Sequence, residues 1–263
     1  MVRFSGALLA GLGQTLVSLV RGVGTQAMVL AAAIGATLRG ECDGDELKSA
    51  LLRLGLGSIP VVVSTAVFVG GLMVVQSAPL LARFGAESYL GWGAGFGILR
   101  EVGPVLTGLM ISGRVGSNNT AELGTLTVTE QVDGLRALAI DPAGYLLAPR
   151  VWAIILTTLV GTAISMIVAL LGAAAAGLFL LHVHPLTFYN GLTSGMLTWL
   201  DVLHGLAKAF AFGVVIATSS TAYGLGATGG PPGVGRAVGS SVVATAVLIF
   251  AMDALVSMTA RVQ

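Results

Sequence analysis

The sequence contains few charged residues. Only 10% of its 263 residues are charged, whereas about 25% is usual for a soluble protein. Hydrophobic residues make up 55% of the chain, so we expect much of it to lie in lipid. The formal net charge is +1, which excludes the strongly basic surface of a nucleic-acid-binding protein.

Cysteine and lysine are also scarce, and their scarcity excludes two classes of site. A single cysteine, Cys42, excludes an internal disulfide and a cysteine-rich metal site. Neither of the two lysines, Lys48 and Lys208, follows a glycine. The chain therefore lacks the Gly-x-x-x-x-Gly-Lys-[Ser/Thr] sequence that binds ATP phosphates. Any process that is driven by ATP would therefore need a separate ATPase subunit to bind ATP and Mg²⁺.

The three histidines do not predict a metal site. His182 and His184 lie in a turn between apolar runs with no cysteine or carboxylate beside them, and His204 begins the next run. No residue is recognisable as an activated nucleophile either. We therefore predict no catalytic residue, no metal and no cofactor in this chain.

Apolar runs divide the sequence into pieces that could cross a membrane, which takes about 20 residues. No charge occurs between Arg53 and Arg83, so a first span is predicted at 54–80. Further spans are predicted at 89–113, 150–180, 202–224 and 237–260. The His182–Pro185 turn and the Gly229–Gly233 cluster separate the later ones.

The sequence thus predicts an all-α integral membrane protein with one membrane domain, residues 1–263. An interfacial N-terminal region, 1–48, would precede a five-span core, 49–263. At the N-terminus we favour an amphipathic surface helix over a cleaved signal peptide, because Gln14, Arg21 and Gln26 interrupt the first apolar stretch.

Basic residues predict the orientation. With a cytoplasmic N-terminus, nine of them fall on or near the cytoplasmic side, and Arg83 and Arg261 fall clearly outside, as the positive-inside rule requires. The nine are Arg3, Arg21, Arg39, Lys48, Arg53, Arg114, Arg136, Arg150 and Arg236.

The predicted cytoplasmic loop, 115–149, is the most polar part of the chain but keeps a helical pattern. Its apolar residues recur roughly three or four residues apart, at Leu123, Leu126, Val128, Val132, Leu135 and Leu138. We therefore predict one amphipathic helix over 121–140, ended by Asp141-Pro142 and exposed for docking.

Four charges fall inside predicted spans, where an ionisable side chain is costly unless it is paired or faces water. They are Arg100, Glu101, Lys208 and Asp253. Lys208 is the predicted partner of Glu101. Two interpretations remain open, a polar cavity and a structural ion pair, and for Asp253 we favour a structural role.

Several linked motifs in about 55 residues resemble the MlaE-type permease family. They are Leu99-Arg100-Glu101-Val102-Gly103-Pro104-Val105, Gly113-Arg114-Val115-Gly116-Ser117, Ala121-Glu122-Leu123-Gly124, Thr129-Glu130-Gln131-Val132-Asp133, Asp141-Pro142 and Pro149-Arg150-Val151-Trp152-Ala153. The likeness continues more weakly through Gly70–Gln76, Lys208 and Gly233–Arg236.

The resemblance implies a permease subunit of an ABC transporter that moves phospholipid or a related lipid between the inner membrane and the outer envelope of a bacterium. It implies a second permease copy, which Arg114 suggests is identical, a dimer of cytoplasmic ATPase subunits, and a periplasmic ring of MCE-domain proteins. By likeness, the lipid cavity would involve Gln76, Leu80, Leu81, Arg100, Glu101 and Lys208. The residues coupled to the ATPase would be Glu122, Thr129, Glu130, Asp133 and Leu135.

Two other functions compete with this interpretation. A secondary transporter could use protons through Glu101 and Asp253, but that function does not explain the structured polar loop. A membrane-embedded lipid enzyme would need a nucleophile or a metal constellation, and neither is recognisable in the sequence.

Overall fold

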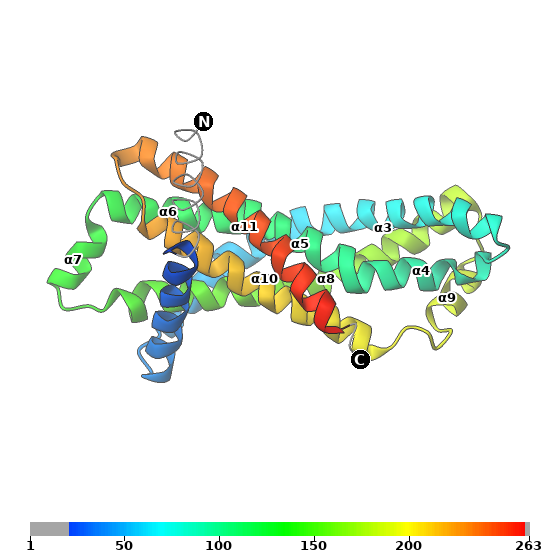
Figure 1. Cartoon of the computed structure of the whole chain (residues 1–263), viewed down its shortest axis with the longest axis horizontal. Helices are drawn as coiled ribbons and strands as arrows, with labels where there is room; N and C mark the ends of the chain where they lie inside the picture. Colours follow the sequence, from blue (N-terminus) through cyan, green and yellow to red (C-terminus); the bar gives the residue numbers. More distant parts are fainter. Residues whose placement is uncertain (1–20, 261–263) are drawn as a thin grey trace, which may run out of the picture.

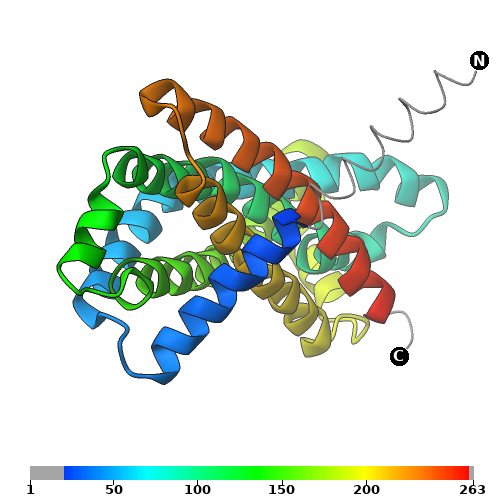
Figure 2. The same cartoon turned by 60° about the vertical axis from the view of Figure 1, so that its left-hand side comes forward.

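The computed structural model describes residues 21–260, which form an elongated bundle of helices (Figures 1 and 2). The helices are α2 (Gly44–Ala50), α3 (Gly57–Arg83), α4 (Leu90–Gly97), α5 (Gly103–Ile111), α6 (Ser117–Val128), α7 (Gln131–Ala137), α8 (Ala148–Leu181), α9 (Pro185–Leu192), α10 (Trp199–Leu225) and α11 (Gly230–Ala260). Wider π-helical turns join some of them: η1 (Leu51–Leu56), η3 (Ile98–Val102), η4 (Ser112–Gly116) and η5 (Ala143–Leu147). A short 3-10 turn, η2 (Glu87–Tyr89), precedes α4.

Five continuous helical stretches are long and apolar enough to cross a membrane, which confirms the predicted number of spans. They are Gly44–Arg83, Leu90–Val128, Ala143–Leu181, Trp199–Leu225 and Gly230–Thr259. They run antiparallel in chain order, so the turns gather at two ends of the bundle. We call these the α7 end and the α9 end, after the short helix that lies at each (Figure 1).

The first and third spans pack most closely, through glycines. A Cβ atom on Gly70 of α3 would lie 1.9 Å from the carbonyl oxygen of Ala169 on α8. A Cβ atom on Gly172 of α8 would lie 2.5 Å from the carbonyl oxygen of Val67 on α3. Any larger residue would therefore separate the two backbones, and this contact fixes how α3 and α8 lie against each other.

Residues 21–38 form a helix that runs across the bundle axis at the α7 end, as expected for a helix at a membrane surface (Figure 1). Its end is held by Thr37, whose hydroxyl accepts a hydrogen bond of 2.8 Å from the indole of Trp152 on α8. Arg39 lies 3.6 Å from Asp141, which precedes η5. The predicted interfacial region begins at residue 1, and its first 20 residues lie outside the described part of the chain.

Several boundaries differ from the sequence prediction, and the first and third helical stretches begin at Gly44 and Ala143 instead of 54 and 150. The second span does not end near 113 but continues as one helix to Val128, and Asn119 and Thr120 in this continuation are buried inside the bundle. The fifth span begins at Gly230 instead of 237. The chain turns at Gly229 and Gly230, where φ is positive, and the following prolines fit the first helical turn, where no backbone N–H is needed.

Candidate functional site

A buried lysine joins three spans. Lys208 of α10 is fully buried, and its Nζ donates a 2.6 Å hydrogen bond to Oε2 of Glu101 in η3. The same Nζ lies 2.8 Å from Oδ1 of Asp253 on α11. Ser257, also on α11, lies 3.2 Å from the other carboxylate oxygen of Glu101. The predicted Glu101–Lys208 partnership is confirmed, and Asp253 is a second carboxylate on the same ammonium group.

Arg100 in η3 belongs to a neighbouring pair. Its guanidinium lies 3.3 Å from Oδ1 of Asp201, on the first turn of α10, and 5.2 Å from the ring centroid of Phe96. The other carboxylate oxygen of Asp201 accepts a 2.8 Å hydrogen bond from the backbone N–H of Thr198. Asp201 therefore caps α10 and positions Arg100 at the same time. The sequence analysis did not single out Asp201, although a Thr-x-x-Asp sequence at a helix start is a capping signal.

Two cations and three carboxylates make up this charge cluster, which we define as Arg100, Glu101, Asp201, Lys208 and Asp253. Each cation is already paired with a carboxylate from another helix. The Lys208 side chain is 0% exposed, whereas the side chains of Arg100 and Glu101 are 27% and 46% exposed. In this conformation Arg100 and Glu101 can meet a ligand, and Lys208 holds Glu101 in place.

The π-helical turn η3 explains how adjacent charges on one span reach different partners. A π-helical turn is wider than an α-helical turn and often occurs at functional positions. Gly103 follows it, and a Cβ atom there would lie 2.5 Å from the carbonyl oxygen of Ile98. Glycine at 103 therefore allows the widened turn that places Arg100 near Asp201 and Glu101 near Lys208.

The three predicted cavity-wall residues lie on α3. Gln76 and Leu80 are exposed, and Leu81 is half-buried against a core formed with α4, α8 and α9. The charge cluster lies instead where η3, α10 and α11 meet. Gln76 and Leu80 thus face outward from this single copy, and a cavity lined by both groups would need a surface from outside the chain.

At the α7 end, the predicted single helix over 121–140 is wrong, because the chain forms two helices with a break at Thr129 and Glu130. Glu130 has a left-handed backbone (φ 60°), which ends α6 and turns the chain into α7. The Thr129 hydroxyl donates a 2.8 Å hydrogen bond to the Thr125 carbonyl and so closes the last turn of α6. We call residues 129–142 the α7 hairpin.

The α7 hairpin packs through Val132 against a small core at its base and has an exposed outer face. Val132 packs with Leu123, Leu146 and Leu147, so this part of the predicted apolar stripe faces inward, whereas Leu138 at its end is 72% exposed. Leu135 is half-buried. Asp133 is exposed and pairs with Arg136 at 2.7 Å. Thr129, Glu130, Asp133 and Leu135 are therefore brought together on this hairpin.

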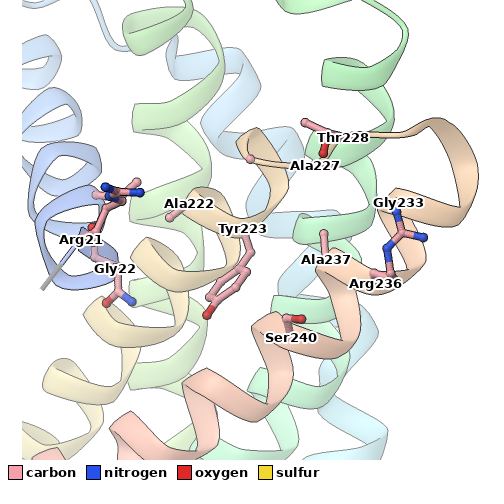
Figure 3. Close-up of a pocket in the computed structure, with 13 residues that line it drawn as sticks. Arg21, Gly22, Ala222, Tyr223, Ala227, Thr228, Gly233, Arg236, Ala237 and Ser240 are labelled. Atoms are coloured by element: carbon pink, nitrogen blue, oxygen red, sulfur yellow. The ribbon is translucent and has the colours of Figure 1, made fainter. Parts of the chain in front are cut away.

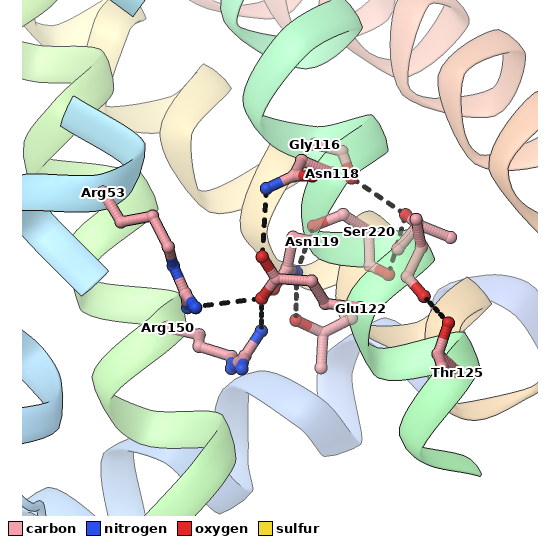
Figure 4. Close-up of polar contacts among 11 residues, drawn as sticks. Arg53, Gly116, Asn118, Asn119, Glu122, Thr125, Arg150 and Ser220 are labelled. Carbon is pink, nitrogen blue, oxygen red and sulfur yellow. Dashed lines mark hydrogen bonds and ion pairs between the residues drawn. The ribbon is translucent and has the colours of Figure 1, made fainter. Parts of the chain in front are cut away.

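Glu122 lies apart from these four residues, within the body of α6 (Figure 4). Its Oε2 accepts a 2.7 Å hydrogen bond from Arg150 of α8 and lies 3.2 Å from Arg53 of η1. Its Oε1 accepts a 3.1 Å hydrogen bond from the amide of Asn118. We call Arg53, Glu122 and Arg150 the Glu122 cluster, and it joins the first three spans.

A buried polar network lies beside the Glu122 cluster (Figure 4). The amide of Asn119 on α6 donates to the hydroxyls of Ser220 (2.9 Å) and Thr221 (3.2 Å) on α10. The Thr120 hydroxyl lies 3.0 Å from that of Ser241 on α11. The Asn119 amide nitrogen and the Thr120 hydroxyl thus have partners on other helices, and that is why a polar sequence here does not mean solvent exposure.

An open pocket of about 450 Å³ lies at the α7 end, between the helix over 21–38, the end of α10 and the start of α11 (Figure 3). Arg21 and Arg236 approach it from opposite sides, with Tyr223 between them. The sequence analysis did not predict this pocket, because its walls come from segments about 200 residues apart.

Within residues 21–260, no group of three or more His, Cys, Asp or Glu side chains is arranged to hold a metal ion. His184 has a structural role, since its Nδ1 accepts a 3.2 Å hydrogen bond from the backbone of Leu186 at the start of α9.

Comparison with known proteins shows that this chain is similar to permeases. The family model described as Permease MlaE matches residues 48–259. A "Probable ABC transporter permease protein" of Rickettsia felis is 36% identical over 245 residues, covering 93% of this chain and 94% of the relative.

Two further relatives carry more specific names. The "Protein TRIGALACTOSYLDIACYLGLYCEROL 1, chloroplastic" of Arabidopsis thaliana is 32% identical over 223 residues, which cover 84% of this chain and 63% of that protein. The "Intermembrane phospholipid transport system permease protein MlaE" of Haemophilus influenzae is 29% identical over 200 residues, 76% of this chain and 77% of that protein.

Proposed function

This chain belongs to the MlaE permease family, and we propose that it moves phospholipid or a related lipid between the inner membrane and the outer envelope of a bacterium. Membership makes it a multi-pass membrane subunit of an ABC transporter, which is not itself catalytic and works with an ATPase. The observation that carries the proposal is the continuous helical stretch Leu90–Val128. It holds Arg100 and Glu101 in the bundle and ends in the α7 hairpin.

The lipid would bind beside the charge cluster. Arg100 and Glu101 are its partly exposed members and offer both signs of charge to a headgroup. Gln76, Leu80 and Leu81 would form the acyl-chain wall, and Lys208 would keep the Glu101 carboxylate oriented. The name of the Haemophilus relative supports phospholipid as the substrate.

A second, identical copy would complete the cavity. The helix α11 carries an exposed face, Gly235, Gly239, Val243, Val247 and Phe250, at a spacing of three or four residues. Small residues on such a face allow two helices to approach closely in a membrane. A periplasmic ring of MCE-domain proteins would lie at the α9 end.

The α7 hairpin would bind the ATPase, which holds ATP and Mg²⁺. Its outer face presents Thr129, Glu130, Asp133 and Leu135, and Leu138 beside them is 72% exposed. A mixed charged and apolar surface at the end of a rigid helix is suited to receive force from a partner. The N-terminus and the α7 end would then be cytoplasmic.

The test is reconstitution of the permease with its ATPase in liposomes that contain a fluorescent phospholipid. We expect transfer of the lipid to an acceptor protein or membrane to require ATP and both subunits. Transfer by the permease alone, driven by a proton gradient and abolished by Glu101→Gln, would instead establish a secondary transporter. Absence of lipid transfer in the presence of a hydrolysing ATPase would also overturn the proposal.

Two substitutions at Glu130 separate its backbone role from its charge. Glycine adopts φ 60° without strain, so Glu130→Gly keeps the turn and removes the carboxylate, while Glu130→Lys reverses the charge. If the carboxylate contacts the ATPase, both variants lose copurifying ATPase, and Glu130→Lys loses more. Unchanged ATPase binding and lipid transfer in both variants would exclude Glu130 from the contact.

A further inference from the structure

The two helices that flank the α7 hairpin, α6 and α8, are joined at its base by the carboxylate of Glu122. Glu122 lies on α6, six residues before that helix ends, and Arg150 lies on the first turn of α8. Their 2.7 Å hydrogen bond joins positions 28 residues apart and so closes the hairpin. The side chain of Arg150 is only 7% exposed, so this pair is largely removed from solvent.

Arg53 adds the first span to the same carboxylate. It lies in η1, 3.2 Å from the Oε2 atom that Arg150 also contacts. Since η1 precedes α3, which packs tightly on α8, the Glu122 carboxylate is the point where the second and third spans meet the start of the first. Its second oxygen is held by Asn118, so the carboxylate has little freedom to turn.

From this geometry we infer that Glu122 is a positioning residue that transmits movement of the α7 hairpin to the first span, and not a contact for the ATPase. This inference rests on the proposed function. A partner pushing on the α7 hairpin moves α6 and α8 together because Glu122 and Arg150 tie them. Arg53 passes the same movement to η1, and α3 carries the proposed cavity wall.

The π-helical turn η1 suits this role. A π-helical turn within an α-helix is rare and frequently occurs at functional sites. Arg53 lies within this π-helical segment, whereas Gly70 and Gly172 hold α3 closely against α8 further along. A pull on Arg53 would therefore alter the start of the first span before it disturbs the glycine contact.

Arg53→Gln tests this inference most directly, because it removes the ion pair to the first span and leaves the buried Glu122–Arg150 pair intact. In liposomes with the ATPase, we expect the lipid moved per ATP hydrolysed to fall by roughly fivefold or more, the scale of a typical coupling between sites. The permease should still bind the ATPase. Arg53→Lys, which keeps the charge, should restore most of the ratio. Asp45→Asn is the matched control, since Asp45 is an exposed carboxylate at the same end and outside the cluster.

A double-variant comparison distinguishes force transmission from direct contact of Arg53 with a lipid. Glu122→Gln should lower the same ratio, and the Arg53→Gln/Glu122→Gln double variant should be no worse than Glu122→Gln alone. Additive losses would show that the two residues act separately and would overturn the inference. So would an unchanged ratio in Arg53→Gln.

Failure of the inference can be told from failure of the proposed function. If the unaltered permease moves lipid with ATP and Arg53→Gln does so equally well per ATP, only the role of the Glu122 cluster is wrong. If the unaltered permease moves no lipid while the ATPase hydrolyses ATP, the proposed function itself is wrong. Loss of copurifying ATPase in Glu122→Gln, with normal thermal unfolding, would show that Glu122 is an ATPase contact after all.

Discussion

At the scale of single residues, the side chain that most constrains this protein is Lys208. An ammonium group loses its hydration when it is fully buried, and only close carboxylates can compensate. Glu101 and Asp253 provide them from two other spans, at 2.6 and 2.8 Å. One nitrogen atom therefore links η3, α10 and α11.

Replacing Lys208 by methionine tests this dependence. Lys208→Met leaves two carboxylates near each other without a counter-charge, and loss of one partner of a buried pair costs about 3–5 kcal/mol. We expect a clearly lower Tm in detergent micelles. The triple variant Lys208→Met, Glu101→Gln and Asp253→Asn removes all three charges and should recover much of the loss. If the triple variant unfolds as early as the single one, the pairing is not the source of the stability.

The single cysteine allows a second test at this scale. Burial, together with the negative charge of Asp43, raises the pKa of the Cys42 thiol above its ordinary value. Because the thiolate is the reactive form, Cys42 should react with maleimide more slowly than glutathione at pH 7.5, and its rate should keep rising at higher pH.

Asp43→Asn gives the matched comparison for Cys42. Asp43 caps α2 through hydrogen bonds from the backbones of Asp45 and Glu46, and asparagine can make the same cap. The variant should therefore keep the helix, lower the thiol pKa and raise the reaction rate near neutral pH. A rate equal to that of glutathione in the unaltered protein would contradict the shifted pKa.

At the scale of helices, close packing of α3 on α8 depends on glycine at positions where the two backbones touch. Gly70→Ala would insert a methyl group 1.9 Å from the Ala169 carbonyl oxygen. Overpacking of this kind costs about 1–3 kcal/mol, so we expect a lower Tm and weaker lipid transfer. Gly93→Ala is the control, because a Cβ atom at Gly93 meets nothing within 4 Å, and alanine there should be neutral or stabilising. Equal effects of the two substitutions would argue against the close contact.

At the scale of the whole molecule, the bundle is longer than a membrane is thick. The 34 residues of α8 correspond to about 51 Å at 1.5 Å per residue, against about 30 Å of hydrocarbon. Parts of the first three spans must therefore project beyond the lipid core. In Figure 1, α3, α4 and α8 extend past the ends of α10 and α11 toward α9, which indicates the α9 end as the projecting side.

The distribution of basic residues predicts which end faces the cytoplasm. Arg39, Arg53, Arg136 and Arg150 lie toward the α7 end, whereas Arg83 ends α3 at the α9 end. In a Cys42→Ser background, Asn190→Cys on α9 should react with an impermeant maleimide on intact spheroplasts. Ala137→Cys on α7 should react only after permeabilisation. The opposite pattern would reverse the proposed orientation.

The sequence by itself determined the number of spans, the turn at His182–Pro185, the family and the Glu101–Lys208 pair. These follow from local composition, since uncharged runs of sufficient length must cross lipid as helices. A lone buried lysine and a glutamate on different spans also need each other. The motif block from Leu99 to Arg150 indicated the family because several motifs occur there in order.

Only the tertiary structure decided where the second span ends and what Glu122 contacts. Polarity along the chain predicted a loop from 115, but Asn119, Thr120 and Glu122 find partners on α8, α10 and α11. A sequence shows that a side chain is polar; it does not show whether water or another helix satisfies that side chain. For the same reason Glu122, which the sequence placed on an exposed helix, forms ion pairs that join three spans.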